Sequence, residues 1–198
     1  MEKFSLNDEC TFVRITEDMN VNRFSCGDND LDDFFHNEAV LYTRQLLGKT
    51  YAFVTNEPPY RVVAMLTLAN DSIKSTLIPN SSRNKLQRKI PYSKHTRSYP
   101  AVLIGRLGVS EHFQGKDLKV GSQVIDYLKY LFTREENLTG CRFLVVDAYN
   151  EQRVLGFYEK NGFSFLYRTE ELEREAFHIN GEEPLHSRMM YLDLLSFE

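Results

Sequence analysis

The chain of 198 residues contains 42% hydrophobic and 26% charged residues, a composition that is typical of globular proteins and excludes wholesale disorder. A chain of this length fits one domain, so we predict a single domain over residues 1–198. The net charge of −4 argues against a protein dedicated to nucleic-acid binding, because cationic contacts to phosphate dominate that affinity.

Cysteine usage and the N-terminus indicate the compartment. The three cysteines, Cys10, Cys26 and Cys141, form no close pair and leave one over, which favours a reducing compartment. The stretch MEKFSLNDECTF has no apolar signal core, and no apolar run approaches the roughly 18 residues of a membrane span. We therefore expect a cytoplasmic protein without membrane contact. The sequence has no HExxH motif and no paired CxxC motifs, so we expect no metal site.

The first elements in chain order are a strand and a helical segment. A short alternating run at 11–15 predicts an edge strand. Asp28 or Asn29 is a good N-cap for apolar residues at helical spacing, and Gly48 is a suitable stop. We predict one or two helices between these points.

A hairpin and a long irregular segment follow. Strands at 50–55 and 61–69 flank the turn-forming NEPPY segment, in which the prolines exclude a helix or a central strand. Residues 70–100 lack periodicity, apart from a short helix predicted near 82–88. A connection of this length is more often functional or mobile than accidental.

The second half of the chain alternates strands with helices. An apolar strand at 102–109 leads through a polar elbow, residues 110–119, into a helix at 120–132. The remaining predicted elements are a central strand at 142–148, a helix at 151–161 capped by Asn150, a strand at 163–167, an acidic loop at 169–184 and a final strand at 189–194. This pattern predicts an α/β or α+β fold, with a mixed sheet covered by helices on both faces.

The strand at 102–109 and the helix after it form a candidate anion-binding site. A helix start directs free backbone N–H groups at one point and favours phosphate there. Lys116 and Lys119 flank this start, and Gly121 and Ser122 lie within it.

Two glycines, Gly105 and Gly108, interrupt the apolar strand. Glycine inside a strand marks either the close approach of a ligand or a tight packing contact. The sequence leaves both interpretations open.

Several segments resemble the GNAT acetyltransferases: RLGVSEHFQGK with VGSQVIDYLKYLF, then FLVVDAYN, and then VLGFYEKNGF. The resemblance spans about 50–194 and is strongest over 103–163. It implies a mixed, mostly antiparallel central sheet and binding of acetyl-coenzyme A (acetyl-CoA) as the cosubstrate. In addition, FSCGDNDLDDFF at 24–35 is similar to a helical segment of a subgroup that includes toxins acetylating aminoacyl-tRNA.

In that family the pattern Q/R-x-x-G-x-G/A at a helix start binds the pyrophosphate of the coenzyme. Counted from the strand, the pattern begins at Gln114 and its small positions fall on Asp117 and Lys119. Counted from the helix, Lys116 takes the first position and Lys119 and Gly121 take the small ones, which corresponds to two extra residues in the elbow. We expect Asp117 to point away from the phosphates, because like charges repel. The residues that the resemblance implies for cosubstrate binding are Leu107, Gly108, Val109, Gln114, Gly115, Lys116, Lys119, Val120, Gly121, Ser122 and Asn150.

The resemblance also implies roles in acyl transfer. Tyr158 matches the family's tyrosine that protonates the departing coenzyme A sulfur, and a phenol keeps its proton to about pH 10, above the roughly 8.5 of a thiol. Packing within the Phe157–Tyr158 pair is the alternative. A backbone N–H within 107–109 would stabilise the oxyanion, and Asn150 either contacts the pantetheine arm or only caps its helix. No general base is evident.

The expected reaction is transfer of the acetyl group to a primary amine of a small molecule or peptide, by direct attack. In this fold the acceptor usually lies against the first helices and the final hairpin, here 31–47 and 169–188. Acetylation of aminoacyl-tRNA is one alternative, and a non-catalytic coenzyme A-binding module is another, because counting from the strand replaces both glycine positions. The sequence leaves open whether the protein forms a homodimer. The basic residues that favour an RNA acceptor are Arg83, Lys85, Arg88, Lys89, Lys94 and Arg97.

Overall fold

The computed structural model describes residues 4–75, 78, 80–87, 90, 98–115 and 117–197. The chain divides into two compact units, Met1–Ala69 with Ile104–Glu136, and Asn70–Leu103 with Asn137–Glu198. The expectation of a single domain over the whole chain stays a prediction.

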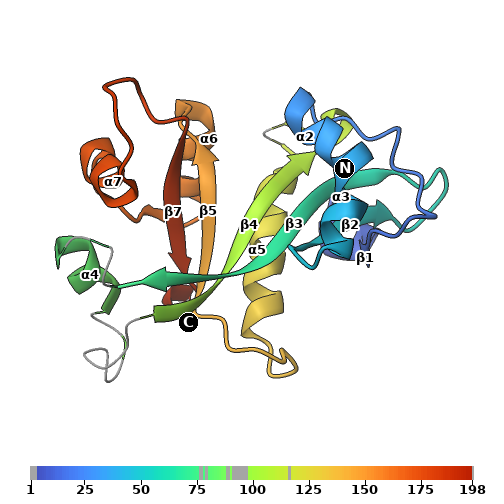
Figure 1. Cartoon of the computed structure of the whole chain (residues 1–198). Coiled ribbons are helices and arrows are strands. Elements are labelled where there is room, and N and C mark those ends of the chain that lie inside the picture. Colours follow the sequence, from blue (N-terminus) through green and yellow to red (C-terminus); the bar gives the residue numbers. More distant parts are fainter. Residues whose placement is uncertain are drawn as a thin grey trace. The chain divides into compact units, whose positions relative to one another are not determined.

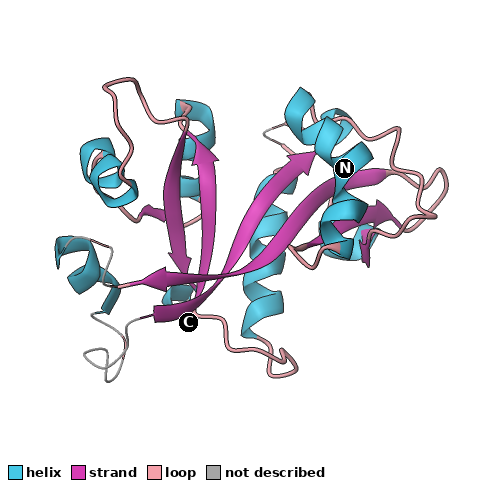
Figure 2. Ribbon diagram, viewed as in Figure 1, coloured by secondary structure: helices cyan, strands magenta, loops and turns pink. Residues whose placement is uncertain are grey.

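The strands of the described residues form a seven-stranded sheet. They are β1 (Cys10–Arg14), β2 (Lys49–Thr55), β3 (Val62–Lys74), β4 (Ser98–Val109), β5 (Phe143–Tyr149), β6 (Ser164–Phe165) and β7 (Ser187–Asp193). Their order is β1-β2-β3-β4-β5-β7-β6 (Figure 1, Figure 2). The pair β4/β5 is parallel over 101–103 and 143–145, whereas β1/β2, β2/β3, β5/β7 and β6/β7 are antiparallel. The sheet is thus mixed and mostly antiparallel, as the resemblance implied.

The helices agree with the predicted pattern in most places. They are α1 (Leu6–Glu9), α2 (Asn29–Asp33), η1 (Phe34–Glu38), α3 (Ala39–Arg44), α4 (Asn80–Gln87), η3 (Glu111–Phe113), α5 (Val120–Thr133), α6 (Gln152–Lys160), α7 (Glu170–Phe177) and η4 (Leu194–Phe197). None of the helices in the described part of the chain has the length and apolarity that a membrane crossing requires.

In the first unit, helices cover both faces of the sheet. On one face the ring of Tyr127 from α5 packs against Phe12 and Phe53, at centroid separations of 4.9 and 5.0 Å. On the other face Phe34 and Phe35 pack in a buried cluster with the strands. Side chains alternate between the two faces of a strand, so β1 and β2 supply residues to both layers.

The second of these layers is one helical run, α2-η1-α3, with a π turn in its middle. Asp28 begins it as predicted, because its carboxylate accepts a hydrogen bond of 3.0 Å from the backbone N–H of Leu31. The run ends at Arg44, and Leu46 has a φ of 57°. The helix therefore stops before Gly48, the predicted stop.

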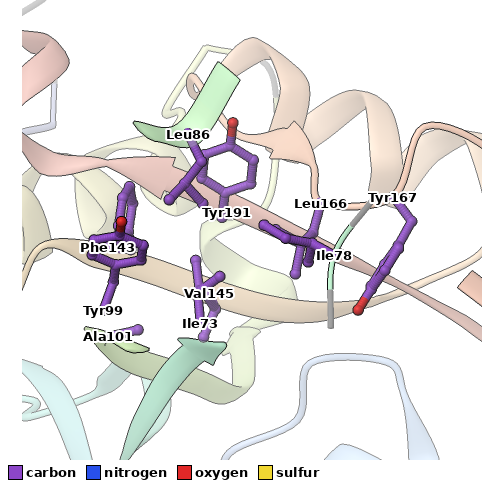
Figure 3. Packing of buried hydrophobic residues seen from close by; sticks show 10 residues of the cluster. All are labelled: Ile73, Ile78, Leu86, Tyr99, Ala101, Phe143, Val145, Leu166, Tyr167 and Tyr191. Atoms are coloured by element: carbon purple, nitrogen blue, oxygen red, sulfur yellow. The ribbon is translucent and has the colours of Figure 1, made fainter. Parts of the chain in front are cut away.

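In the second unit, buried side chains on β5 and β7 face the helices α4 and α7 (Figure 3). Phe143 makes an edge-to-face contact of 5.8 Å with Tyr191, and Leu172 of α7 packs against the same cluster. The alternate residues Leu144 and Val146 are also buried. Strand β5 is thus buried on both faces, as its continuous apolar run predicted.

The acidic segment predicted as a loop contains helix α7 instead. Its N-cap Thr169 accepts a hydrogen bond from the backbone N–H of Leu172. Glu173 is only 3% exposed and accepts a 2.7 Å bond from Arg188, so one face of this charged helix turns inward. The prediction of a loop was wrong because a run of acidic residues was interpreted as fully solvated.

Two strands are longer than predicted. Residues 70–74 continue β3 and residues 98–101 belong to β4, although 70–100 showed no periodicity. The short helix predicted near 82–88 corresponds to α4. Residues 88, 89, 94 and 97 of the predicted basic run lie outside the described residues.

Candidate functional site

The elbow after β4 is tied to the body of the first unit by backbone hydrogen bonds. The N–H of Ser110 donates to the carbonyl of Val63, and the N–H of Glu111 donates to that of Ser25, both at 2.9 Å. The short helix η3 then turns the chain toward α5. These bonds fix where the strand ends and therefore where the following helix starts.

Gln114 is used to hold this elbow in place. Its side-chain amide donates 2.8 Å hydrogen bonds to the carbonyl oxygens of Val109 and Cys26. One side chain thus joins the end of β4 to the segment before α2. Gln114 positions the elbow and does not present its amide N–H groups to a ligand.

The start of α5 has the properties of an anion site. Lys119, its N-cap, is exposed and makes no capping bond with its side chain. The first N–H groups of an α-helix have no partner within the helix. Among the described residues, no side chain and no backbone carbonyl outside the helix accepts from the N–H groups of Val120, Gly121 or Ser122, so they form a candidate anion site.

The backbone at Lys119 is in an unusual conformation. Its φ of 51° and ψ of 33° lie in the left-handed region, which favours glycine. Counting the family pattern back from the helix puts a glycine at this position. The conformation therefore agrees with that count, and lysine adopts the backbone geometry of the glycine.

The two strand glycines differ in their surroundings. A Cβ on Gly108 would lie 3.1 Å from Cys26 Sγ and 3.1 Å from a ring carbon of Phe35. A Cβ on Gly105 would meet only the carbonyl oxygen of Thr67, at 3.9 Å. Close packing explains the glycine at 108, whereas packing does not require one at 105.

Tyr158 is a buried phenol on α6 of the second unit, 7% exposed. Phe157 and Phe163 pack edge-on against its ring, both with centroids 5.1 Å away. Burial raises the pKa of the phenol well above its usual value. The phenol therefore keeps its proton near neutral pH, and no described residue hydrogen-bonds its hydroxyl.

Asn150 connects the end of β5 to the loop before β7. Its side-chain amide donates to Glu170 Oε1 at 3.0 Å and to the carbonyl of Leu185 at 2.8 Å. Glu170 in turn accepts from the N–H of Leu185, and these two bonds hold the pKa of its carboxyl below the usual range, the Leu185 bond contributing most. The interpretation of Asn150 as a helix cap was wrong, because Glu151 is the N-cap of α6. No described donor bonds its amide oxygen.

Comparisons with known proteins concern the fold of the whole chain. No protein-family model matches the sequence, and no curated protein matches it significantly. AtaT complexed with acetyl-methionyl-tRNAfMet matches with a TM-score of 0.64 and 22% identity, covering 96% of this chain and 97% of that chain. A mutant of KacT matches with a TM-score of 0.63 and 19% identity, with the same coverage. A tyrosine-to-phenylalanine mutant of the AtaT toxin, bound to the C-terminus of the antitoxin AtaR and acetyl-CoA, gives 0.60 and 19%, covering 96% of each chain.

AtaT and KacT have the architecture of the GNAT acetyltransferases, and the alignments run over almost the whole chain. This chain has the GNAT fold. The expected fold class is therefore confirmed, including the mostly antiparallel sheet and the helices on both of its faces.

The predicted site residues fall on both units of the GNAT fold. Leu107, Gly108 and Val109 end strand β4 in the first unit, and the elbow and the start of α5 follow them. Asn150 and Tyr158 lie in the second unit. Lys116 lies outside the described residues. Gly115 and Asp117 are exposed. The roles of all these residues in catalysis and cosubstrate binding stay predictions.

Two features of this chain were missed from the sequence. Arg106 stacks on Phe34, with 3.6 Å between its guanidinium carbon and the ring centroid. The signal was a single cation inside an otherwise apolar strand. Glu170 was treated as part of a solvated loop, although Thr169 directly before it is a good N-cap. Within the described residues no group of three or more His, Cys, Asp or Glu side chains is placed to hold a metal ion.

Proposed function

We propose that this protein is an acetyltransferase that moves the acetyl group of acetyl-CoA to a primary amine. One observation carries the proposal: a strand with the predicted coenzyme-binding segment leads through the elbow into a helix whose first N–H groups have no partner among the described residues. Val120, Gly121 and Ser122 supply those donors, and Lys119 adds a positive charge beside them. Together they fit the pyrophosphate of the cosubstrate.

In the proposed reaction the neutral amine attacks the thioester carbonyl directly. The C–N bond forms, the tetrahedral intermediate collapses, and the C–S bond breaks. Tyr158 donates its phenolic proton to the departing sulfur and regains a proton from solvent, while the amine nitrogen releases its extra proton to water. The raised pKa of Tyr158 keeps the phenol protonated where the amine is reactive, and it also makes the phenol a weaker acid, so the proton transfer accompanies breaking of the C–S bond.

The acceptor that we favour is the α-amine of an aminoacyl-tRNA. AtaT has been seen with acetyl-methionyl-tRNAfMet, which favours this class over a small-molecule amine. The chain has no evident general base, which favours an acceptor amine that is already partly neutral at pH 7. An α-amine with a pKa near 8 is about one-tenth neutral at pH 7, whereas a lysine amine with a pKa of roughly 10.4 is almost entirely protonated. Small amines and peptide N-termini are the alternative acceptors.

A non-catalytic coenzyme A-binding module is the second candidate. Two observations favour it: Gln114 is committed to the elbow, and Lys119 stands at a glycine position. Such a module would bind coenzyme A and transfer nothing.

A direct assay separates these functions. The protein is incubated with acetyl-CoA and either a pool of aminoacyl-tRNAs or a panel of small amines and peptides, and acetylated product is measured. We expect product on aminoacyl-tRNA, a rate at least about 100-fold lower in Tyr158→Phe, and an unchanged rate in Tyr60→Phe, which alters an exposed tyrosine.

Other results of the assay would overturn part or all of the proposed function. Turnover of small amines alone would show that the protein is an acetyltransferase with a small amine, and not aminoacyl-tRNA, as its acceptor. Stabilisation by coenzyme A in a thermal melt, with no product from any amine, would establish the non-catalytic module. Expression that arrests growth in wild type and not in Tyr158→Phe would agree with the tRNA acceptor.

A further inference from the structure

Arg106 lies beside two aromatic side chains of the run α2-η1-α3. Its guanidinium carbon lies 3.6 Å from the centroid of Phe34 and 5.6 Å from that of Tyr42. The two rings pack edge to face on each other at 5.7 Å, and Phe34 is only 3% exposed. The contact with the buried ring of Phe34 therefore restricts where the guanidinium of Arg106 lies.

The N–H groups of this guanidinium have no protein partner among the described residues. No described carboxylate lies within ion-pair distance, and no described oxygen accepts a hydrogen bond from it. The other two half-buried or buried arginines on strands or strand ends are paired, Arg142 with Asp193 and Arg188 with Glu173, both at 2.7 Å. Within the described chain only Arg142 Nε is fully buried without a partner, so the nitrogens of Arg106 reach solvent.

The position of Arg106 on β4 puts it near the expected place of the acceptor. It directly precedes residues 107–109, along which we propose that acetyl-CoA lies. Side chains two apart in a strand share a face, and the missing Cβ of Gly108 points at Cys26 and Phe35. Arg106 thus lies on the face of β4 that the run α2-η1-α3 covers, the run against which the acceptor is expected.

We propose that Arg106 binds a phosphate oxygen of the acceptor RNA, next to its aminoacylated end. This inference rests on the proposed acetylation of aminoacyl-tRNA. A planar guanidinium offers parallel N–H donors that match a phosphate, and the contact with the ring of Phe34 restricts where those donors lie. An aminoacyl ester has no free carboxylate, so phosphate is the anion that such an acceptor brings to this point. One oriented cation has particular value in a chain whose net charge is −4.

The test measures tRNA binding and acetylation over a series of salt concentrations. Arg106→Gln removes the charge, Arg106→Lys keeps it without the planar fork, and Arg14→Gln removes an exposed strand arginine of the same unit as a control. For Arg106→Gln we expect a tRNA KM and Kd raised about 10- to 100-fold, with kcat changed only a few-fold. The slope of log K against log salt should fall by about 0.7 to 0.9, the value of one phosphate contact. Arg106→Lys should keep the slope and lose part of the affinity, and Arg14→Gln should behave like wild type.

Three results would overturn the inference. The first is an Arg106→Gln protein that binds tRNA with wild-type affinity and salt slope while wild type acetylates tRNA; the proposed function would then stand without this contact. The second is an effect of equal size in Arg14→Gln, which would indicate general charge. The third is weaker use of a carboxylate-bearing amine with unchanged tRNA binding, which would assign Arg106 to a carboxylate.

Folding of the variants and failure of the proposed function are both distinguishable from these results. Arg106→Met keeps the apolar stem that packs on Phe34, so it replaces Arg106→Gln if that variant melts many degrees lower. Absence of tRNA acetylation by wild type would rule out the proposed acceptor. The tRNA-binding measurements would still compare the salt slopes of wild type and variant, and they would show whether Arg106 contacts a phosphate.

Discussion

The side-chain amide of Gln114 donates a 2.8 Å hydrogen bond to the carbonyl oxygen of Cys26, 88 residues earlier in the chain. The same amide nitrogen also reaches the carbonyl of Val109. In the sequence Gln114 stands where the family pattern has a residue at the pyrophosphate. In the structure it ties the segment before α2 to the elbow that leads to α5, so its contribution is to the shape of the site.

Replacement of Gln114 should therefore lower stability as well as cosubstrate affinity. Gln114→Ala loses two hydrogen bonds, which should reduce the free energy of unfolding by about 1–2 kcal/mol. Gln114→Glu should be worse, because a carboxylate would face two carbonyl oxygens without a donor. Urea denaturation measures the first effect, and the thermal shift produced by acetyl-CoA measures the second. A Gln114→Glu protein as stable as Gln114→Ala would contradict this account.

The two strand glycines should respond differently to alanine. Gly108→Ala brings a methyl group to 3.1 Å from Cys26 Sγ and from Phe35, which is 1% exposed and cannot move easily. Overpacking of this kind costs about 1–3 kcal/mol. Gly105→Ala is the matched control, since its methyl group would meet only an oxygen at 3.9 Å. Urea midpoints of the two variants compare them directly, and equal midpoints would show that packing does not require the glycine at 108.

The left-handed backbone at Lys119 gives a separate prediction. Lys119→Ala and Lys119→Gly both remove the charge, but only glycine relieves the strain at a φ of 51°. The glycine variant should be more stable than the alanine variant by about 1 kcal/mol. Both should lose the same acetyl-CoA affinity if the ammonium group contacts the phosphates. Thermal melts with and without acetyl-CoA separate the two effects, and an alanine variant as stable as the glycine variant would speak against strain.

Asp32 should make stability depend on pH in the acid range. Partial burial raises the pKa of its carboxyl, but hydrogen bonds from Cys26 and Ser25 lower it by more, so the net pKa lies below the ordinary 3.8. A lowered pKa means that the folded state favours the carboxylate, so this stabilisation is complete above about pH 4 and disappears as pH falls through the folded pKa.

Asp32→Asn tests this dependence. At pH 7 the variant should be about 1–3 kcal/mol less stable than wild type, and the difference should shrink as the pH approaches 3. Asp30→Asn, on the exposed side of α2, is the control and should show no such trend. Urea denaturation at a series of pH values measures both, and a difference that grows toward acid would reverse the assignment.

Local features of the fold could be predicted from the sequence because their causes are local. The carboxylate of Asp28 meets an N–H three residues away, and the alternation along β1 and β2 follows from the pleat of a single strand. The same holds for the passage from β4 through the elbow into α5, since strand, turn and helix are consecutive in the chain. The candidate phosphate site was visible for this reason.

Partners far apart in the sequence were decided only by the tertiary structure. Nothing near Gln114 indicates that its amide meets Cys26, and nothing near Arg106 indicates that Phe34 lies under its guanidinium. The sequence predicted that Glu173 is solvated, but in the structure it is buried and accepts a hydrogen bond from Arg188 of strand β7. A polar side chain is buried or left free according to which strands lie beside it, and periodicity does not determine strand order. The sequence by itself therefore predicted where the chain turns toward the candidate site, whereas the tertiary structure decided which polar groups bond to one another and which have no partner among the described residues.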